Sequence, residues 1–226
     1  MDCAGFLVFD CDGTIVDSQF MIIAAMNEAF DGVGLTRPDN NNVRRVVGLS
    51  LPEAISRLLG EADQLAVADL AERYKRAFRR AREDGGREPF YPGAREAIIR
   101  FSEAGYLLGV ATGKSRRGLL AVLEQAGIRS HFVSLQTADD APGKPHPAML
   151  RQAMADAGAS ADETLMIGDT SYDIDMARAA GVVGLGVSWG YHAPQDLITA
   201  GAVRVVDDYP ALERAVPELL INRVTR

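Results

Sequence analysis

The sequence predicts an α/β fold, and two observations indicate it. Along most of the chain, short continuous apolar runs alternate with helical patterns, which is typical of a parallel sheet covered by helices on both faces. Residues 16–88 interrupt this alternation, because they contain several amphipathic stretches and no strand-like run. We therefore expect a Rossmann-like core domain of residues 1–15 and 89–226, with an all-helical cap domain of residues 16–88 inserted after the first strand.

Six apolar runs make up the predicted sheet. The first begins at Gly5 and ends at Asp10, and the turn residues Gly13 and Thr14 follow it. The other runs are Tyr106 to Ala111, Phe132 to Leu135, Thr164 to Ile167, Val182 to Val187 and Val203 to Val206, and helix starts between them are marked by Pro92, Ser115, Pro147 and Ser171.

The predicted cap consists of amphipathic helices. Its linkers to the core are expected near residues 15–18 and 85–92, because Asp84-Gly85-Gly86 closes the last helix and Tyr91-Pro92-Gly93 resumes the α/β pattern. The helical stretches run from Gln19 to Phe30, from Asn42 to Val47, from Leu51 to Leu59 and from Asp63 to Glu83.

Composition narrows the class of protein. The chain has 226 residues, of which 47% are apolar and 24% charged, as in an ordinary globular protein with a sizeable core. Its net charge of −7 argues against non-specific nucleic-acid binding and against anionic membranes. Cys3 and Cys11 are too few for a disulfide framework, and the first residues lack the features of a signal peptide. We expect a cytoplasmic protein, monomeric or homodimeric, that binds neither nucleic acid nor membrane.

Polar residues follow four of the predicted strands. Because ligands of an open α/β sheet bind beyond the carboxyl ends of its strands, these residues are expected to share one pocket. Several carboxylates there repel each other unless a cation lies among them, and carboxylates are ligands that Mg²⁺ prefers. Lysine and threonine side chains would bind the anionic oxygens of a phosphoryl group. The residues are Asp10 and Asp12, then Thr112, Gly113 and Lys114 as substrate-binding residues, then Lys144, and finally Asp169 and Asp173.

Asp10 and Asp12 have a spacing that suits covalent phosphoryl transfer. Asp10 would attack phosphorus, while Asp12 protonates the departing alcohol and later deprotonates the water that hydrolyses the aspartyl-phosphate. The two residues therefore predict a phosphoryl-transfer enzyme that acts on a small phosphorylated metabolite.

The same residues resemble the motifs of the haloacid dehalogenase superfamily, and in particular its phosphoglycolate phosphatase-like branch with a helical cap. Asp10-Cys11-Asp12-Gly13-Thr14 resembles the first motif, Thr112 the second, Lys144 in Gly-Lys-Pro the third, and Gly168-Asp169-Thr170-Ser171-Tyr172-Asp173 the fourth. The likeness covers essentially the whole chain, and four motifs in the expected order are much more specific than one.

This resemblance implies a role for each residue. Asp10 is the implied nucleophile and a metal ligand, and Asp12 is the implied general acid/base, which also offers its backbone carbonyl to Mg²⁺. Thr112 and Lys144 are implied to be catalytic residues that hold the phosphoryl oxygens. The implied metal site consists of Asp10, Asp12, Asp169 and Asp173.

Several functions are compatible with these residues. The dehalogenases of the superfamily lack the acid two positions after the nucleophile, so Asp12 favours a Mg²⁺-dependent phosphatase, that is, a phosphoric monoester hydrolase. The alternatives are a sugar phosphomutase, whose cap excludes water well enough to return the phosphoryl group to the substrate, and a non-catalytic protein that binds a phosphorylated ligand. Phosphoglycolate, a nucleotide and a sugar phosphate all remain open as the substrate.

The cap is expected to select the substrate. Its candidate surface is Val43 to Ser50, where Gly48 would allow close approach of the backbone. Arg44 and Arg45 cannot both face the pocket, because adjacent helical residues diverge by about 100°. We assign Arg45 to substrate binding, with two solvated arginines as the alternative.

Some of these residues also have purely structural interpretations. Asp169 and Asp173 could complement the dipole of the helix that follows them. Lys114 could be a solvated loop side chain. Tyr191, which follows the fifth predicted strand, is expected to pack against the edge of the sheet.

Overall fold

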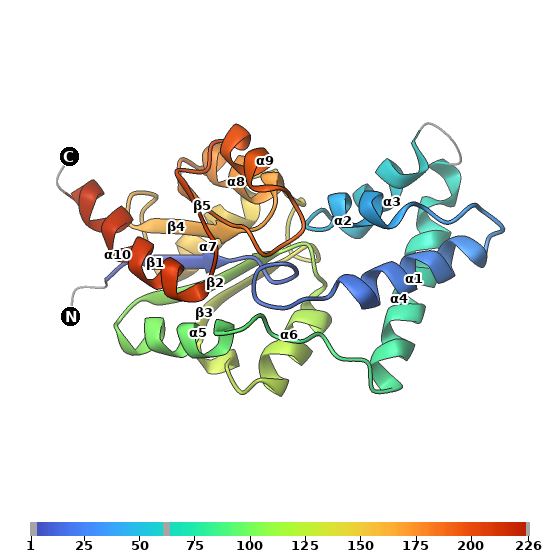
Figure 1. Ribbon diagram of the computed structural model, residues 1–226, viewed down its shortest axis with the longest axis horizontal. Coiled ribbons are helices and arrows are strands. Elements are labelled where there is room, and N and C mark those ends of the chain that lie inside the picture. Colours follow the sequence, from blue (N-terminus) through green and yellow to red (C-terminus); the bar gives the residue numbers. More distant parts are fainter. Residues whose placement is uncertain (1–3, 61–63, 225–226) are drawn as a thin grey trace.

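One parallel sheet lies at the centre of the core (Figure 1). The computed structural model describes residues 4–60 and 64–224, and within them six strands are arranged in the order β3-β2-β1-β4-β5-β6. Each strand begins and ends within two residues of its predicted apolar run, so the predicted sheet is confirmed. The strands are β1 (Phe6–Phe9), β2 (Leu107–Thr112), β3 (Phe132–Thr137), β4 (Thr164–Gly168), β5 (Val183–Val187) and β6 (Arg204–Val206).

The central strand β1 shows why the apolar runs are continuous. It pairs with β2 on one side and with β4 on the other, and its side chains are fully buried. Because successive side chains of a strand point to opposite faces, Leu7 and Phe9 join one hydrophobic cluster and Phe6 and Val8 join another. Both faces of the sheet are therefore apolar and must be covered.

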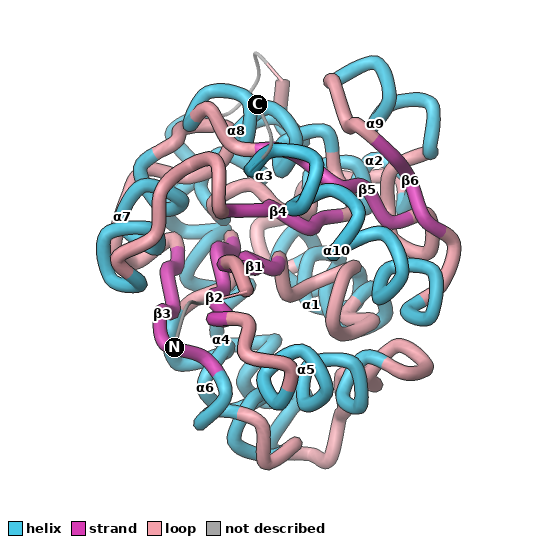
Figure 2. Tube along the Cα trace, turned by 90° about the vertical axis from the view of Figure 1, so that its left-hand side faces the viewer, coloured by secondary structure: helices cyan, strands magenta, loops and turns pink. Residues whose placement is uncertain are grey.

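Helices cover both faces of the sheet (Figure 2). They are α5 (Ala94–Glu103), α6 (Arg116–Gln125), α7 (Ala148–Ala157), α8 (Ser171–Ala180), α9 (Pro194–Ala200) and α10 (Tyr209–Val224), with a 3₁₀ turn η2 (Arg129–His131) before β3. Side chains of α5, α6 and α10 pack on one face, and side chains of α7 and α8 pack on the other. The predicted start signals lie within two residues of these helices; Ser115, for example, caps α6 by accepting a hydrogen bond from the Gly118 N–H at 3.3 Å.

The remaining helices form the cap, which lies at the other end of the molecule from α10 (Figure 1). They are α1 (Gln19–Asp31), α2 (Asn40–Val46), α3 (Leu51–Leu59) and α4 (Val67–Glu83), with a 3₁₀ turn η1 (Gln64–Ala66) before α4. These helices share a hydrophobic cluster of their own, which includes Met26, Ile55 and Leu70. The predicted fold class, with its inserted helical cap, is confirmed. The boundaries at 16–88 stay a prediction, and Asp63, the predicted start of the last helix, lies outside the described residues.

The chain enters and leaves the cap through two segments that lie side by side. Val16 and Phe90 form an antiparallel bridge, and the Asp17 N–H donates to the Pro89 carbonyl at 2.8 Å. The cap is therefore attached through a short ribbon that begins directly after the loop at the end of β1.

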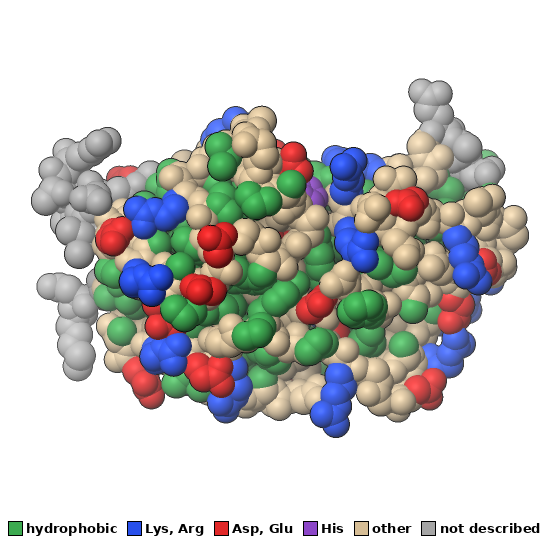
Figure 3. Space-filling model, viewed as in Figure 1, with side chains coloured by type: hydrophobic (Ala, Val, Ile, Leu, Met, Phe, Trp, Pro, Cys, Tyr) green, Lys and Arg blue, Asp and Glu red, His purple; other side chains and the backbone are tan. Residues whose placement is uncertain are grey.

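The face of the molecule seen in Figure 3 carries acidic and basic side chains that are interspersed. In the part of the chain that the structure describes, no helix is both long and apolar enough to cross a membrane. Cys11 is a buried free thiol, and Cys3 lies outside the described residues.

Candidate active site

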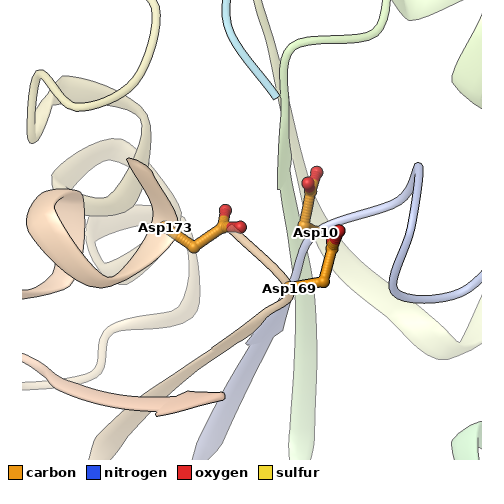
Figure 4. A group of neighbouring side chains, drawn as sticks. All are labelled: Asp10, Asp169 and Asp173. Atoms are coloured by element: carbon orange, nitrogen blue, oxygen red, sulfur yellow. The ribbon is translucent and has the colours of Figure 1, made fainter. Parts of the chain in front are cut away.

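Three buried carboxylates converge at the carboxyl end of the sheet (Figure 4). Asp10 follows β1, Asp169 follows β4 and Asp173 lies in the first turn of α8; each offers one oxygen, and these oxygens all lie within 4.8 Å of one another. β1 and β4 are adjacent strands in register, with Phe9 opposite Ile167, so the residues that follow them come together. The structure thus brings acids from two strand ends into one site, as the sequence indicated.

Hydrogen bonds hold two of these carboxylates in place. Asp169 accepts from the Thr14 hydroxyl at 2.8 Å through Oδ1 and from the Tyr191 N–H at 2.9 Å through Oδ2. Asp173 Oδ2 accepts from the N–H and the hydroxyl of Thr170, at 3.0 and 2.7 Å, in a capping box at the start of α8. One carboxylate oxygen of Asp173 therefore caps α8, and the other faces the cluster.

Lys144 is fully buried beside the three carboxylates. Its Nζ lies 2.8 Å from Asp10 Oδ1 and 2.6 Å from Asp173 Oδ1. Burial raises the pKa of Asp10 to about 7, even though the Lys144 ammonium lowers it. Burial, and then the charge of Asp10, raise the pKa of Asp169 well above its ordinary value. A single ammonium among three carboxylates leaves the cluster short of positive charge.

The residues present fit a hard divalent cation. Asp10 Oδ2 is buried and has no hydrogen-bond partner among the described residues, which is costly unless something else binds it. The backbone encloses Asp169 closely, because a Cβ atom at Gly13 or at Gly190 would lie 2.2 Å from its side chain. Carboxylate oxygens with an excess of negative charge are the donor set that Mg²⁺ prefers.

The Asp12 carboxylate lies in a separate group of polar side chains. Its Oδ1 accepts from the Ser18 hydroxyl at 2.5 Å and from the Lys114 ammonium at 2.7 Å. Lys114 also forms an ion pair with Glu88, and its side chain is 7% exposed. The alternative interpretation of Lys114 as a solvated loop side chain is therefore wrong, because Lys114 is buried against two carboxylates.

The loop after β2 lies directly against the cap. Thr112 is buried at the end of β2, and its hydroxyl oxygen accepts from the Lys114 N–H at 3.3 Å. A Cβ atom at Gly113 would lie 2.4 Å from the carbonyl oxygen of Leu49 and 2.7 Å from that of Gly48. Gly48 has a φ of 96°, a conformation that favours glycine, so it permits the close backbone approach that the sequence indicated.

Two hollows lie along the boundary between cap and core. One has a volume of about 410 Å³ and is lined by Ser50, Glu53 and Arg57 of the cap and by residues 143–146 of the core. The other measures about 240 Å³ and is lined by cap residues that include Arg45 and by residues 191–193 of the core. Arg45 is exposed at this second hollow, which neither Lys144 nor the three carboxylates line.

Several residues that contact the site had no predicted role in it. Thr14 and Tyr191 bind Asp169, whereas Ser18 and Glu88 lie around Asp12 and Lys114. Tyr191 was expected to pack at the edge of the sheet, but its hydroxyl oxygen accepts from the Ser18 N–H at 3.0 Å. Because Tyr191 follows β5, the rule that ligands bind beyond the strand ends would have indicated Tyr191 as a residue near the site. No local pattern marks Ser18 or Glu88.

Comparisons with known proteins identify the family of this chain. A family profile described as "Haloacid dehalogenase-like hydrolase" matches residues 7–187. The "Probable phosphatase IndB" of Dickeya dadantii is 34% identical over 216 residues, which cover 95% of this chain and 94% of that protein. A phosphoglycolate phosphatase of Mesorhizobium japonicum is 37% identical over 190 residues, which cover 82% of this chain and 83% of that protein. The crystal structure of a hydrolase from Pseudomonas syringae has a TM-score of 0.84 and 26% identity, covering 95% of this chain and 98% of that one.

The chain thus combines a Rossmann-like α/β core and an inserted helical cap with buried acids at the ends of its strands. The chain belongs to the haloacid dehalogenase-like hydrolase family, as the sequence motifs indicated. Within that family it groups with phosphatases, so it is a phosphoric monoester hydrolase, and the predicted class of enzyme is confirmed.

Proposed function

We propose that the protein is a Mg²⁺-dependent phosphatase that hydrolyses a small phosphomonoester through an aspartyl-phosphate on Asp10. The observation that supports this most strongly is the convergence of Asp10, Asp169 and Asp173 beside Lys144, all fully buried at the carboxyl end of the sheet. Mg²⁺ held by the carboxylates, together with the Asp12 backbone carbonyl, would neutralise negative charge on the phosphoryl group.

The first half of the proposed reaction forms the intermediate. An Oδ atom of Asp10 attacks phosphorus, and the bond between phosphorus and the leaving oxygen breaks. Asp12 gives its proton to that oxygen, so the product leaves as an alcohol. Thr112 and Lys144 donate hydrogen bonds to the phosphoryl oxygens. Lys144 keeps its proton because Asp10 and Asp173 raise its pKa, although burial alone lowers it.

The second half regenerates the enzyme. Asp12 removes a proton from a water molecule, the water oxygen attacks phosphorus, and the bond between phosphorus and Asp10 breaks. Inorganic phosphate leaves, and Asp10 is again a free carboxylate. The cap loop at Gly48 and Leu49, which lies against Gly113, limits access of bulk water during the first half.

The substrate belongs to the same proposal. The leaving group of a small phosphorylated metabolite would lie in the hollow beside Lys144, where Ser50, Glu53 and Arg57 offer it both donors and acceptors. The name of the relative from Mesorhizobium japonicum makes phosphoglycolate the first compound to test. A cytoplasmic location and a monomeric or homodimeric state stay predictions.

Phosphate release from a substrate panel tests this proposal. The panel should contain phosphoglycolate, sugar phosphates and nucleotides, each assayed with and without Mg²⁺. Asp10→Asn should abolish turnover while circular dichroism shows an intact fold. As a matched control, Asp175→Asn changes an acid that pairs with Arg178 on the surface of α8 and should leave turnover unchanged. Full activity of Asp10→Asn would contradict the covalent mechanism, and turnover independent of Mg²⁺ would contradict the metal requirement.

The fit of the cap loop against Gly113 favours one further candidate. A sugar phosphomutase uses the same acids but returns the phosphoryl group to its substrate, which requires that the cap exclude water well. Conversion of a sugar 1-phosphate to the 6-phosphate without release of inorganic phosphate would identify this activity.

A further inference from the structure

Lys114 is a buried cation placed between two carboxylates that belong to different parts of the chain. It follows β2, and its Nζ lies 2.7 Å from Asp12 Oδ1 and also pairs with Glu88 Oε1. The same Nζ lies 5.3 Å from the centre of the Phe78 ring on α4. The ammonium therefore touches the core, the cap and a linker at the same time.

The two linkers of the cap meet at this lysine. Ser18, at the end of the first linker, has its hydroxyl 2.5 Å from Asp12 Oδ1 and 2.9 Å from Glu88 Oε1. Glu88, in the second linker, also pairs with Arg82 at the end of α4. A serine hydroxyl carries one proton and can serve only one of the two carboxylates at a time. An ammonium carries three, so Lys114 can bind Asp12 and Glu88 together.

We propose that Lys114 is a positioning residue for Asp12 and that Glu88 holds Lys114 in place. Both donors bind Oδ1 of Asp12, which fixes the orientation of the carboxylate and leaves Oδ2 to exchange the proton with the leaving oxygen. This inference rests on the proposed function, in which Asp12 is the general acid/base. It replaces the role in substrate binding that the sequence indicated for Lys114.

The burial of the partners argues against a role in phosphate binding. The Glu88 side chain is 3% exposed and the Asp12 side chain is 11% exposed. If Lys114 turned towards a phosphoryl group, both carboxylates would lose a buried ionic partner, and removing one partner of such a pair is strongly destabilising. Keeping Lys114 on the two carboxylates is therefore favoured.

The kinetic signature of Lys114→Met tests the inference. A misplaced general acid matters most when the leaving group is a poor one, and general acid catalysis contributes at least about 100-fold. Asp12 also activates water in the second half of the reaction, so the comparison uses kcat/KM, which reports only the steps up to departure of the leaving group. We therefore expect kcat/KM for an alkyl phosphomonoester to fall about 100-fold, and kcat/KM for p-nitrophenyl phosphate, whose leaving group needs no proton, to fall much less. Inhibition by inorganic phosphate, which reports binding at the phosphoryl site, should stay close to the wild-type value. Lys75→Met, which removes an exposed lysine paired with Glu72 on α4, is the control and should behave as wild type.

Two results of this kinetic comparison would overturn the inference. A raised KM and weaker inhibition by phosphate, with kcat unchanged, would assign Lys114 to the substrate instead. An equal loss of kcat/KM with both leaving groups would show that Lys114 does not act through proton donation by Asp12.

A second variant tests the inference in case Lys114→Met does not fold. Lys114→Met/Glu88→Gln replaces the buried ion pair with neutral groups of similar shape, which is often tolerated. Because both residues act through one carboxylate, the double variant should lose no more kcat than Lys114→Met does, and additive losses would contradict the inference. Asp12→Asn separates the two proposals: if it keeps full turnover, the proposed function fails, whereas if it is inactive and Lys114→Met is normal, only this inference fails.

Discussion

Gly113 offers a direct test of how closely the cap must fit the core. In Gly113→Ala, the new methyl group would lie 2.4 Å from the Leu49 carbonyl oxygen, whereas ordinary contact begins at 3.4 Å. The cap loop must therefore retreat by about 1 Å, and a misplacement of about 1 Å can cost of the order of 100-fold in rate. We expect kcat/KM for a phosphomonoester to fall by about that factor.

The fold should tolerate this change, because the clash arises where cap meets core and movement of the cap relieves it. The melting temperature of Gly113→Ala should thus stay near the wild-type value. Gly158→Ala is the control with the opposite pattern. Gly158 has a φ of 65° and open space where the methyl group of alanine would lie, so strain of about 1–2 kcal/mol should lower the melting temperature and leave kcat/KM unchanged. A Gly113→Ala enzyme with wild-type kcat/KM would refute the reasoning.

Three further predictions concern buried ionisable groups. Lys144→Met leaves two buried carboxylates without their ammonium and should lower the free energy of unfolding in urea by about 3–5 kcal/mol, and a loss near zero would contradict the ion pairs. Burial raises the pKa of Glu88, but Lys114 and Arg82 bring it below its ordinary value of 4.5. Its contribution to stability is therefore present above pH 4.5 and is lost as the pH falls through the lower folded-state pKa, so Glu88→Gln should weaken the acid dependence of unfolding. Burial raises the pKa of the Cys11 thiol, so iodoacetamide should label it, by peptide mass mapping, only in the unfolded protein.

Local sequence patterns predicted most of the fold, and side-chain hydrogen bonds explain two of the exceptions. α2 begins at Asn40, two residues before the predicted stretch, because the Asp39 side chain accepts from two N–H groups of its first turn. β3 extends past its apolar run to Thr137, because the buried Gln136 finds partners for its amide in Ser134 and Asp156. A polar residue can continue a strand when tertiary contacts bind it, and an apolar pattern does not record this.

The candidate site was predictable where strand geometry decides it. Asp10 and Asp169 follow adjacent parallel strands, so their proximity follows from the order of the strands alone. The partners of Lys114 could not be predicted from the strand order. A lysine side chain has four flexible methylenes, so the direction in which it points depends on which charges lie within reach. Glu88 and Ser18 are distant in sequence and approach each other only because the two linkers pair.

The pairing of the two linkers has a consequence for how the cap can evolve. The points where the helical insert departs and returns are neighbours, joined by the bridge between Val16 and Phe90. A tight turn could span the same gap, so the insert can be excised, enlarged or exchanged for another without altering the spacing that the sheet requires. A different cap could then bind substrates with other leaving groups, while the acids at the strand ends stay unchanged.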